Sequence, residues 1–270
     1  MSELLRKSTK AVFHLAAITD TTVMDQSRML AVNTHGFEPL AAACLQANVP
    51  LAYASSAATY GTPQETQQRK SFPTSAAGRP NNIYGFSKWL MEGVHHRLAA
   101  AGTGSASIVG LRYFNVYGPG ESYKGKMASM VRQLVRQAIE GKTPRLFADG
   151  SQARDQVYVD DVVNATLAAA GIGNGLGTTS ITNPRSGIYN VGSGIATSFN
   201  DIVAAIRHVP ELQNLKAEYF EMPASIREFY QDYTCADLSG NKDGLGWMPV
   251  WKPADAIAVY AHMLVKDSRL

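Results

Sequence analysis

Short apolar runs alternate with segments of helical spacing along the first half of the chain. Three apolar runs have the length and composition of strands covered on both faces: Ala11–Ala16, Leu51–Ser55 and Ser107–Tyr113. Between them, Met24–Ala47 predicts a long helical region and Tyr84–Ala100 predicts a helix. This alternation is typical of a parallel sheet with crossover helices, so we expect an α/β fold.

The pattern becomes more irregular after Pro119. Helical spacing recurs at Ala128–Glu140, Asp161–Ala170 and Ala254–Val265, and short strands are predicted at Arg145–Phe147, Gln156–Tyr158 and Ile188–Val191. Ser198 is expected to begin a further helix, with Asp201 three positions later completing a capping box. We place a domain boundary near residue 118, with a first domain at 1–118 and a smaller lobe at 119–270 that can interleave with it.

Composition and charge exclude several classes of protein. With 270 residues, 45% hydrophobic and 17% charged, the chain can bury a real core. A net charge of +3 without basic runs argues against nucleic-acid binding, and no apolar run approaches the roughly 20 residues of a membrane helix. Cys44 and Cys235 stand far apart in unrelated contexts, which fits neither a disulfide framework nor a metal site and favours the cytoplasm.

Tyr84 and Lys88 form the strongest local signal for chemistry. They stand four positions apart in a predicted helix and therefore share one face. A lysine ammonium beside a phenol favours the phenolate, which would let the tyrosine exchange a proton near neutral pH. The pair alone is weak evidence, because a solvated helix face produces the same spacing by chance.

A cluster of small hydroxyl residues precedes this pair. Tyr53–Gly61, YASSAATYG, directly follows an apolar strand, and open α/β sheets bind their ligands at the carboxyl ends of strands. Ser56 could hydrogen-bond a substrate alcohol there while a tyrosine removes its proton; ordinary turn chemistry is the alternative. The polar loop Gly61–Asn82 that follows is long enough to be functional or mobile.

The order and spacing of several segments resemble the extended short-chain dehydrogenase/reductases. The segments are FHLAA, YASSAATYG, YGFSK, LRYFNVYGP and RDQVYVDDV. Two others, FNVYGPGESYKGKMAS and YQDYTCADL, are most similar to the members that epimerise an ADP-linked heptose. The resemblance implies a Rossmann-like, doubly wound parallel sheet with a smaller α/β substrate-binding lobe. It also implies a nucleotide-sugar epimerase that uses NADP or NAD in assembly of the lipopolysaccharide core.

The same resemblance assigns roles to individual positions. Ser56 matches the catalytic hydroxyl, Tyr84 the acid/base, Lys88 the residue that holds the nicotinamide ribose and lowers the pKa of the tyrosine, and Lys124 a second acid/base. The expected cofactor contacts are Tyr84, Lys88, Ala16, Ala17, Thr19, Asn33 and Val116. The expected substrate contacts are Ser56, Asn115, Phe147, Ser151, Arg154 and Tyr230. Two plainer interpretations stay open: an ion pair of Arg154 with Asp155, and a solvated Lys124 beside Lys126.

The sequence departs from the family at its front. A dinucleotide fold normally begins with a strand, a Gly-rich turn and a helix, and nothing before Ala11 has this pattern, so we expect the first βαβ units to be missing from this sequence. Gly171–Gly177 lacks the required spacing, and in Gly192–Thr197 a threonine stands at the final glycine. We expect neither segment to bind phosphate. The residues that select NAD or NADP are absent for the same reason.

Two other functions compete with the heptose epimerase. One is a 4-epimerase or dehydratase of a UDP- or dTDP-sugar, and the other is a non-catalytic homologue that binds sugar nucleotides. The expected partners are a nucleotide-sugar and further copies of the chain in a homo-oligomer, with no metal, nucleic acid or membrane.

Overall fold

A four-stranded parallel sheet forms the centre of the larger lobe. The computed structural model describes residues 5, 8–102, 104–173, 175–179, 184–222 and 230–267. The strand order in the sheet is β1-β2-β3-β7, and all three pairings are parallel. The bounds of the strands are β1 Val12–His14, β2 Leu51–Ser56, β3 Ile108–Tyr113 and β7 Gly187–Val191.

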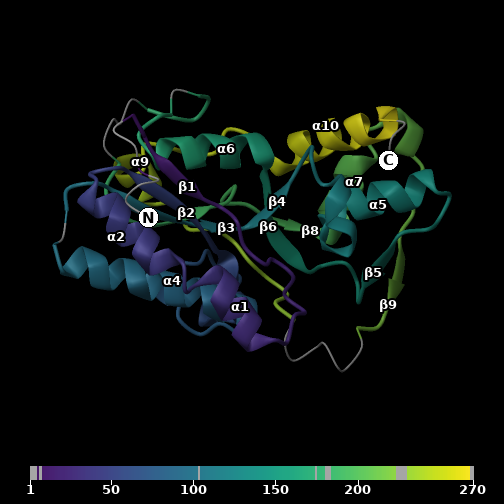
Figure 1. Cartoon of the computed structure of the whole chain (residues 1–270). Coiled ribbons are helices and arrows are strands. Elements are labelled where there is room, and N and C mark those ends of the chain that lie inside the picture. Colours follow the sequence, from purple (N-terminus) through teal and green to yellow (C-terminus); the bar gives the residue numbers. More distant parts are fainter. Residues whose placement is uncertain are drawn as a thin grey trace.

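Helices cover both faces of this sheet (Figure 1). One face carries α1, α2 and α4, with bounds Gln26–Asn33, Phe37–Gln46 and Ile83–Ala100; the other carries α6, Val159–Ala168. Alternate residues of β2 belong to different cores: Leu51 and Tyr53 pack with α2 and α4, whereas Ala52 packs with α6 and Trp247. The predicted α/β fold, a parallel sheet wound on both faces, is confirmed.

The smaller lobe has a helical core of its own. Its helices α5, α7 and α10, at Met130–Ile139, Phe199–Ile206 and Pro253–Lys266, pack around one apolar cluster. Its strands form the sheets β4-β6-β8 and β5-β9. Their bounds are β4 Asn115–Tyr117, β5 Arg145–Phe147, β6 Ala153–Tyr158, β8 Ala196–Ser198 and β9 Glu218–Phe220. Short helices complete the structure: α3 Gln64–Gln68, α9 Asn241–Gly244 and several 3-10 turns.

The two lobes exchange segments of chain. Strand β7 lies well beyond residue 118 but pairs with β3 in the first sheet, and α6 packs on that same sheet. The chain therefore does not divide spatially into 1–118 and 119–270. None of the helices in the described ranges is long and apolar enough to cross a membrane.

The structure differs from the sequence prediction in one helical region and one additional strand. Met24–Ala47, predicted as one helical region, is divided into α1 and α2 by the turn at 34–36. Pro39 explains the break, because its ring would clash with the carbonyl of residue 35 in a continuous helix. Strand β4 was not predicted, because three residues carry too little periodicity to be recognised. The capping box of Ser198 and Asp201 at the start of α7 is confirmed.

The Gly192–Gly194 turn holds a carboxylate of the protein itself. The backbone N–H groups of Ser193 and Gly194 donate to Asp155 at 2.6 and 2.9 Å, and the N–H of Ala236 adds a third bond at 2.9 Å. Complete burial raises the pKa of Asp155 to about 6, although these hydrogen bonds oppose the rise. The turn is therefore filled from within, which agrees with the expectation that it binds no phosphate.

A buried ion pair ties α4 to β3. Glu92 and Arg112 are 3% and 4% exposed, and two hydrogen bonds of 2.8 Å join the guanidinium to the carboxylate. Glu92 also accepts a hydrogen bond from the Ser55 hydroxyl at 2.6 Å, and Arg112 donates to the carbonyl of Thr74 at 2.7 Å. The network thus links the helix, two strands and the polar loop after β2.

We expect Glu92→Ala to destabilise the fold severely. It leaves the Arg112 cation buried without its ion-pair partner, so the free energy of unfolding should fall by about 3–5 kcal/mol. Urea denaturation followed by circular dichroism measures this change. Glu38→Ala is the matched control, because the Glu38–Arg97 pair is exposed and its loss should change stability by less than about 1 kcal/mol. Equal effects of the two variants would contradict the role given to Glu92.

Candidate functional site

A cavity of about 520 Å³ opens at the carboxyl ends of β1, β2 and β3. Ser56, Tyr84, Lys88 and Lys124 all line it, although they come from β2, from α4 and from the loop after β4. The structure therefore brings together the four side chains that the sequence pattern assigned to chemistry. We call this space the reaction cavity.

Close backbone contact sets the distance between Ser56 and Tyr84. Ser56 ends β2 and accepts a hydrogen bond from the N–H of Ala58 at 3.1 Å, which starts the 3-10 turn Ala57–Tyr60. Asn82 caps α4 by accepting from the N–H of Gly85 at 2.7 Å. A Cβ on Gly85 would lie only 2.5 Å from the carbonyl oxygen of Ala58. Glycine at this position therefore lets the first turn of α4 approach the end of β2.

Two opposing effects act on the pKa of the Tyr84 phenol. Burial raises its pKa above the ordinary value, while a hydrogen bond with the Ser56 hydroxyl lowers it. The sequence pattern predicted that Lys88 would lower this pKa, but the structure gives that effect to Ser56. The Lys88 ammonium lies 6.0 Å from the centre of the Tyr84 ring and donates to the carbonyl of Ala54 at 2.8 Å.

Lys88 is buried, and this environment lowers the pKa of its ammonium. It is 1% exposed, and burial lowers its pKa to about 8. The bond to Ala54 is the one hydrogen bond its ammonium makes within the described residues, so two of its three N–H donors have no protein acceptor there. A buried ammonium with unused donors suits the hydroxyl pair of a ribose.

Lys124 also lines the reaction cavity. It belongs to the 3-10 segment Ser122–Met127, and its side chain is 36% exposed. Its ammonium is 3.9 Å from a carboxylate oxygen of Glu121. It is therefore not an isolated solvated lysine. The ammonium of the neighbouring Lys126 lies 3.6 Å from a carboxylate oxygen of Asp20, which belongs to the loop that follows β1.

The predicted cofactor contacts are only partly at the cavity surface. Ala17, Thr19 and Val116 line it, whereas Ala16 is exposed and does not. Asn33 does not line the cavity: it is 1% exposed, and its amide is used by hydrogen bonds of 2.8 and 3.0 Å with the backbone of Ile18. Its place in the structure is to hold the loop after β1, because a buried amide needs internal partners.

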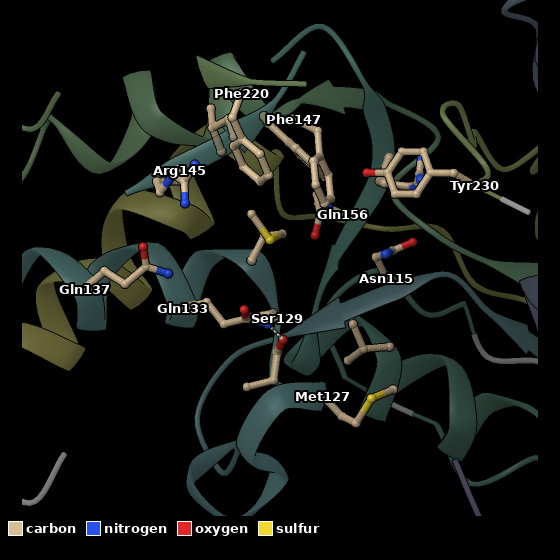
Figure 2. Close-up of a pocket in the computed structure, with 16 residues that line it drawn as sticks. Asn115, Met127, Ser129, Gln133, Gln137, Arg145, Phe147, Gln156, Phe220 and Tyr230 are labelled. Atoms are coloured by element: carbon tan, nitrogen blue, oxygen red, sulfur yellow. Dashed lines mark hydrogen bonds between the residues drawn. The ribbon is translucent and has the colours of Figure 1, made fainter. Parts of the chain in front are cut away.

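A second cavity of about 550 Å³ adjoins the first, and Val116 and Met127 line both. Figure 2 shows Asn115, Phe147 and Tyr230 around it, as the sequence pattern predicted for substrate contacts, together with Gln156. Arg154 also lines this space, which we call the nucleotide cavity. Ser151 lies instead in a neighbouring hollow, which shares Tyr230 with it.

Arg154 is a nearly buried cation of the nucleotide cavity, with Tyr230 and Asp232 as its polar neighbours. It is 9% exposed, its guanidinium lies 5.0 Å from the centre of the Tyr230 ring, and burial lowers its pKa. Its predicted alternative partner, Asp155, is occupied by the Gly192–Gly194 turn, and no ion pair to Arg154 occurs in the described part of the chain. A buried guanidinium facing a cavity is a binding site for an anion such as a diphosphate.

The sequence pattern missed the far end of the nucleotide cavity. Phe220 pairs with Phe147 in the β5–β9 register, and the Arg145 guanidinium stacks 4.3 Å from the centre of the Phe220 ring. Gln137 points into the same end (Figure 2). The period of two along β5 could have revealed Arg145, which shares a face with Phe147. No local signal pointed to Phe220 or Gln137. The described residues hold no group of three or more His, Cys, Asp and Glu side chains that could bind a metal.

The chain is similar in sequence and fold to several known proteins. An ADP-L-glycero-D-manno-heptose-6-epimerase from Cupriavidus pinatubonensis is 34% identical over 278 residues, covering 95% of this chain and 78% of the relative. A crystal structure of the epimerase of the same name from Helicobacter pylori has a TM-score of 0.79 and 33% identity, over 95% of this chain and 73% of that one. MoeE5, solved with UDP-glucose and NAD, has a TM-score of 0.75 and 27% identity, over 97% and 80%.

These similarities confirm the resemblance predicted from the motifs, and a nicotinamide cofactor is characteristic of the group. Residues 1–192, most of the chain, match a single family. The chain belongs to the NAD dependent epimerase/dehydratase family.

Proposed function

We propose that the chain epimerises a nucleotide-sugar, converting ADP-D-glycero-D-manno-heptose to ADP-L-glycero-D-manno-heptose. One observation carries the proposal: Ser56, Tyr84, Lys88 and Lys124 converge on a cavity that adjoins a second one lined by the Arg154 guanidinium. A ligand with a sugar in the first cavity and a nucleotide diphosphate in the second fits this arrangement. The name of the relatives from C. pinatubonensis and H. pylori supports the choice of sugar.

The side chains of the reaction cavity divide the proton transfers between them. Ser56 orients the sugar hydroxyl, and Tyr84 takes and returns its proton. When bound, NAD or NADP supplies the acceptor and donor of the hydride, so the cycle has no net redox change. Epimerisation requires the hydride to return to the opposite face of the carbon. If the sugar turns over between the two steps, the second orientation needs its own proton carrier, and Lys124, which lines the same cavity, provides one.

The surroundings of Lys88 fit a nicotinamide ribose. Its ammonium is fixed by Ala54 and retains donors for two further hydrogen bonds. Ala17 and Thr19 form the adjacent wall at the end of β1. With Asn33 holding Ile18 between them, this wall has a defined shape before any ligand binds.

A UDP- or dTDP-sugar is the second candidate substrate. The amide of Gln137 at the far end of the nucleotide cavity offers both a donor and an acceptor, which would serve uracil as well as adenine. MoeE5, solved with UDP-glucose and NAD, shares the fold at 27% identity. A homo-oligomeric state and a cytoplasmic location stay predictions.

Tyr84→Phe should abolish epimerisation. Without the phenol the substrate proton has no acceptor, and we expect kcat to fall by about 10²–10⁴-fold. The measurement is turnover of ADP-D-glycero-D-manno-heptose, followed by separation of the two epimers. Tyr219→Phe is the control, because Tyr219 is 54% exposed on β9 and lines neither cavity. Unchanged turnover in Tyr84→Phe would refute the assigned role; turnover of UDP-glucose alone would favour the second candidate.

Arg154→Lys should weaken the binding of ADP. An ammonium cannot reproduce the paired donors of a guanidinium, so we expect Kd to rise about tenfold, or about 1.4 kcal/mol. Calorimetric titration with ADP and with UDP measures this and needs neither sugar nor cofactor. Arg136→Lys, at an exposed arginine of α5 paired with Glu140, is the control. Tighter binding of UDP than of ADP would contradict the choice of nucleotide.

Lys88→Met should change how stability depends on pH. The folded pKa of Lys88 is about 8, below its ordinary value of 10.5, so between these values the unfolded chain binds more protons. The cost of burying the ammonium is fully present below pH 8 and disappears as the pH rises to 10.5. The stability of Lys88→Met relative to the natural chain should therefore be greatest at pH 7 and decrease toward pH 10. Urea denaturation at both pH values tests this, with Lys242→Met, at an exposed lysine, as control; a constant difference would show that Lys88 titrates normally.

A further inference from the structure

The loop from Glu121 to Ser129 forms part of the wall of both cavities. Lys124 lines the reaction cavity, Ser129 lines the nucleotide cavity, and Met127 lines both. Within the loop, Gly125 has φ 53° and ψ −125°, a conformation that favours glycine. The position of Lys124 therefore depends on what closes this loop.

Glu121 closes it. The Glu121 carboxylate is 3% exposed, and it accepts hydrogen bonds from the N–H of Ser129 at 2.8 Å and from the hydroxyl of Ser129 at 2.7 Å. Ser129 is also the N-cap of α5, so the same contact fixes the start of that helix. The hydroxyl of Tyr260, on α10, donates at 3.1 Å to the same carboxylate oxygen, Oε2, that accepts from the Ser129 hydroxyl.

The same carboxylate faces the ammonium of Lys124. At 3.9 Å this is the one ion pair of Glu121 among the described residues. Burial keeps the carboxylate in place, because a buried anion needs these hydrogen bonds and a cation nearby. Lys124, with 36% of its side chain exposed, is by contrast the more accessible partner.

We propose that Glu121 is the positioning residue for Lys124. It closes the loop onto α5 and holds the ammonium of Lys124 at the wall of the reaction cavity. The inference rests on the proposed function, in which Lys124 is the second proton carrier. Glu121 itself lines neither cavity and touches no substrate.

Glu121→Gln tests the proposal without substrate or cofactor. Glutamine can still accept from the N–H of Ser129 but carries no charge. Acetic anhydride acylates amines that are free to meet it, so Lys124 should react faster once the contact with Glu121 no longer holds its ammonium. Lys126 is the internal reference, because it pairs with Asp20 instead. We expect the ratio of Lys124 to Lys126 labelling, measured by peptide mass spectrometry, to rise about fivefold; an unchanged ratio would overturn the proposal.

Three further variants complete the labelling experiment. Glu121→Asp restores the charge and should bring the ratio part of the way back. Glu140→Gln, at an exposed glutamate beyond the end of α5, should leave the ratio unchanged. If Glu121→Gln does not fold, the double variant Glu121→Gln, Tyr260→Phe replaces it: it removes one of the two hydroxyl donors that face Oε2, where the amide NH2 would stand, and should raise the ratio in the same direction; no rise would count against the proposal.

A double-mutant cycle separates positioning from a merely structural role. Glu121→Gln should lower kcat for the ADP-heptose about tenfold with little change in KM, and should cause no further loss in a Lys124→Ala background. An equal loss in both backgrounds would mean that Glu121 does not act through Lys124. If Lys124→Ala is itself fully active, the proposed role of Lys124 fails, while the labelling ratio still decides whether Glu121 holds it.

Discussion

Helix α4 contacts the carboxyl end of β2 at three successive turns. Gly85 lies against the carbonyl of Ala58, the ammonium of Lys88 donates to Ala54, and Glu92 accepts from Ser55. These contacts recur at intervals of three to four residues, which is the repeat of one helix face. Because each is a hydrogen bond or a close backbone approach, α4 can neither slide nor rotate on the strand without losing all of them.

This docking determines the chemistry of the reaction cavity. It places the Tyr84 phenol beside Ser56, whose hydrogen bond opposes the rise in pKa that burial causes. It also buries Lys88, so that its pKa falls to about 8. The buried Glu92–Arg112 pair anchors the last of the three contacts to β3. The same face of α4 thus carries Lys88, which lines the reaction cavity, and, one turn further along, Glu92, which forms the buried ion pair.

The adjacent residues Arg154 and Asp155 of β6 have different surroundings. Successive side chains of a strand point to opposite faces. Asp155 turns toward the Gly192–Gly194 amides and is fully used there, whereas Arg154 faces the nucleotide cavity and keeps its charge available. The motif RDQVYVDDV therefore combines one residue that faces a cavity with a structural carboxylate. Its Asp161 accepts from the N–H groups of Val250 and Trp251 and is structural as well.

The sequence by itself determined the elements whose periodicity extends over several residues, and with them the α/β class and the shared face of Tyr84 and Lys88. Local spacing is sufficient there, because a helix or strand repeats its geometry along the chain. It could not determine that Pro39 divides a helical region, that Asn33 faces inward, or that Glu121 meets Lys124 and Ser129. Only the tertiary structure decided these, because whether a polar side chain is buried, and which group neutralises it, depends on segments that lie far away in sequence. The same is true of the far end of the nucleotide cavity. There Phe220 lies beside Phe147 because β5 pairs with β9, a strand that follows it by more than 70 residues in the sequence.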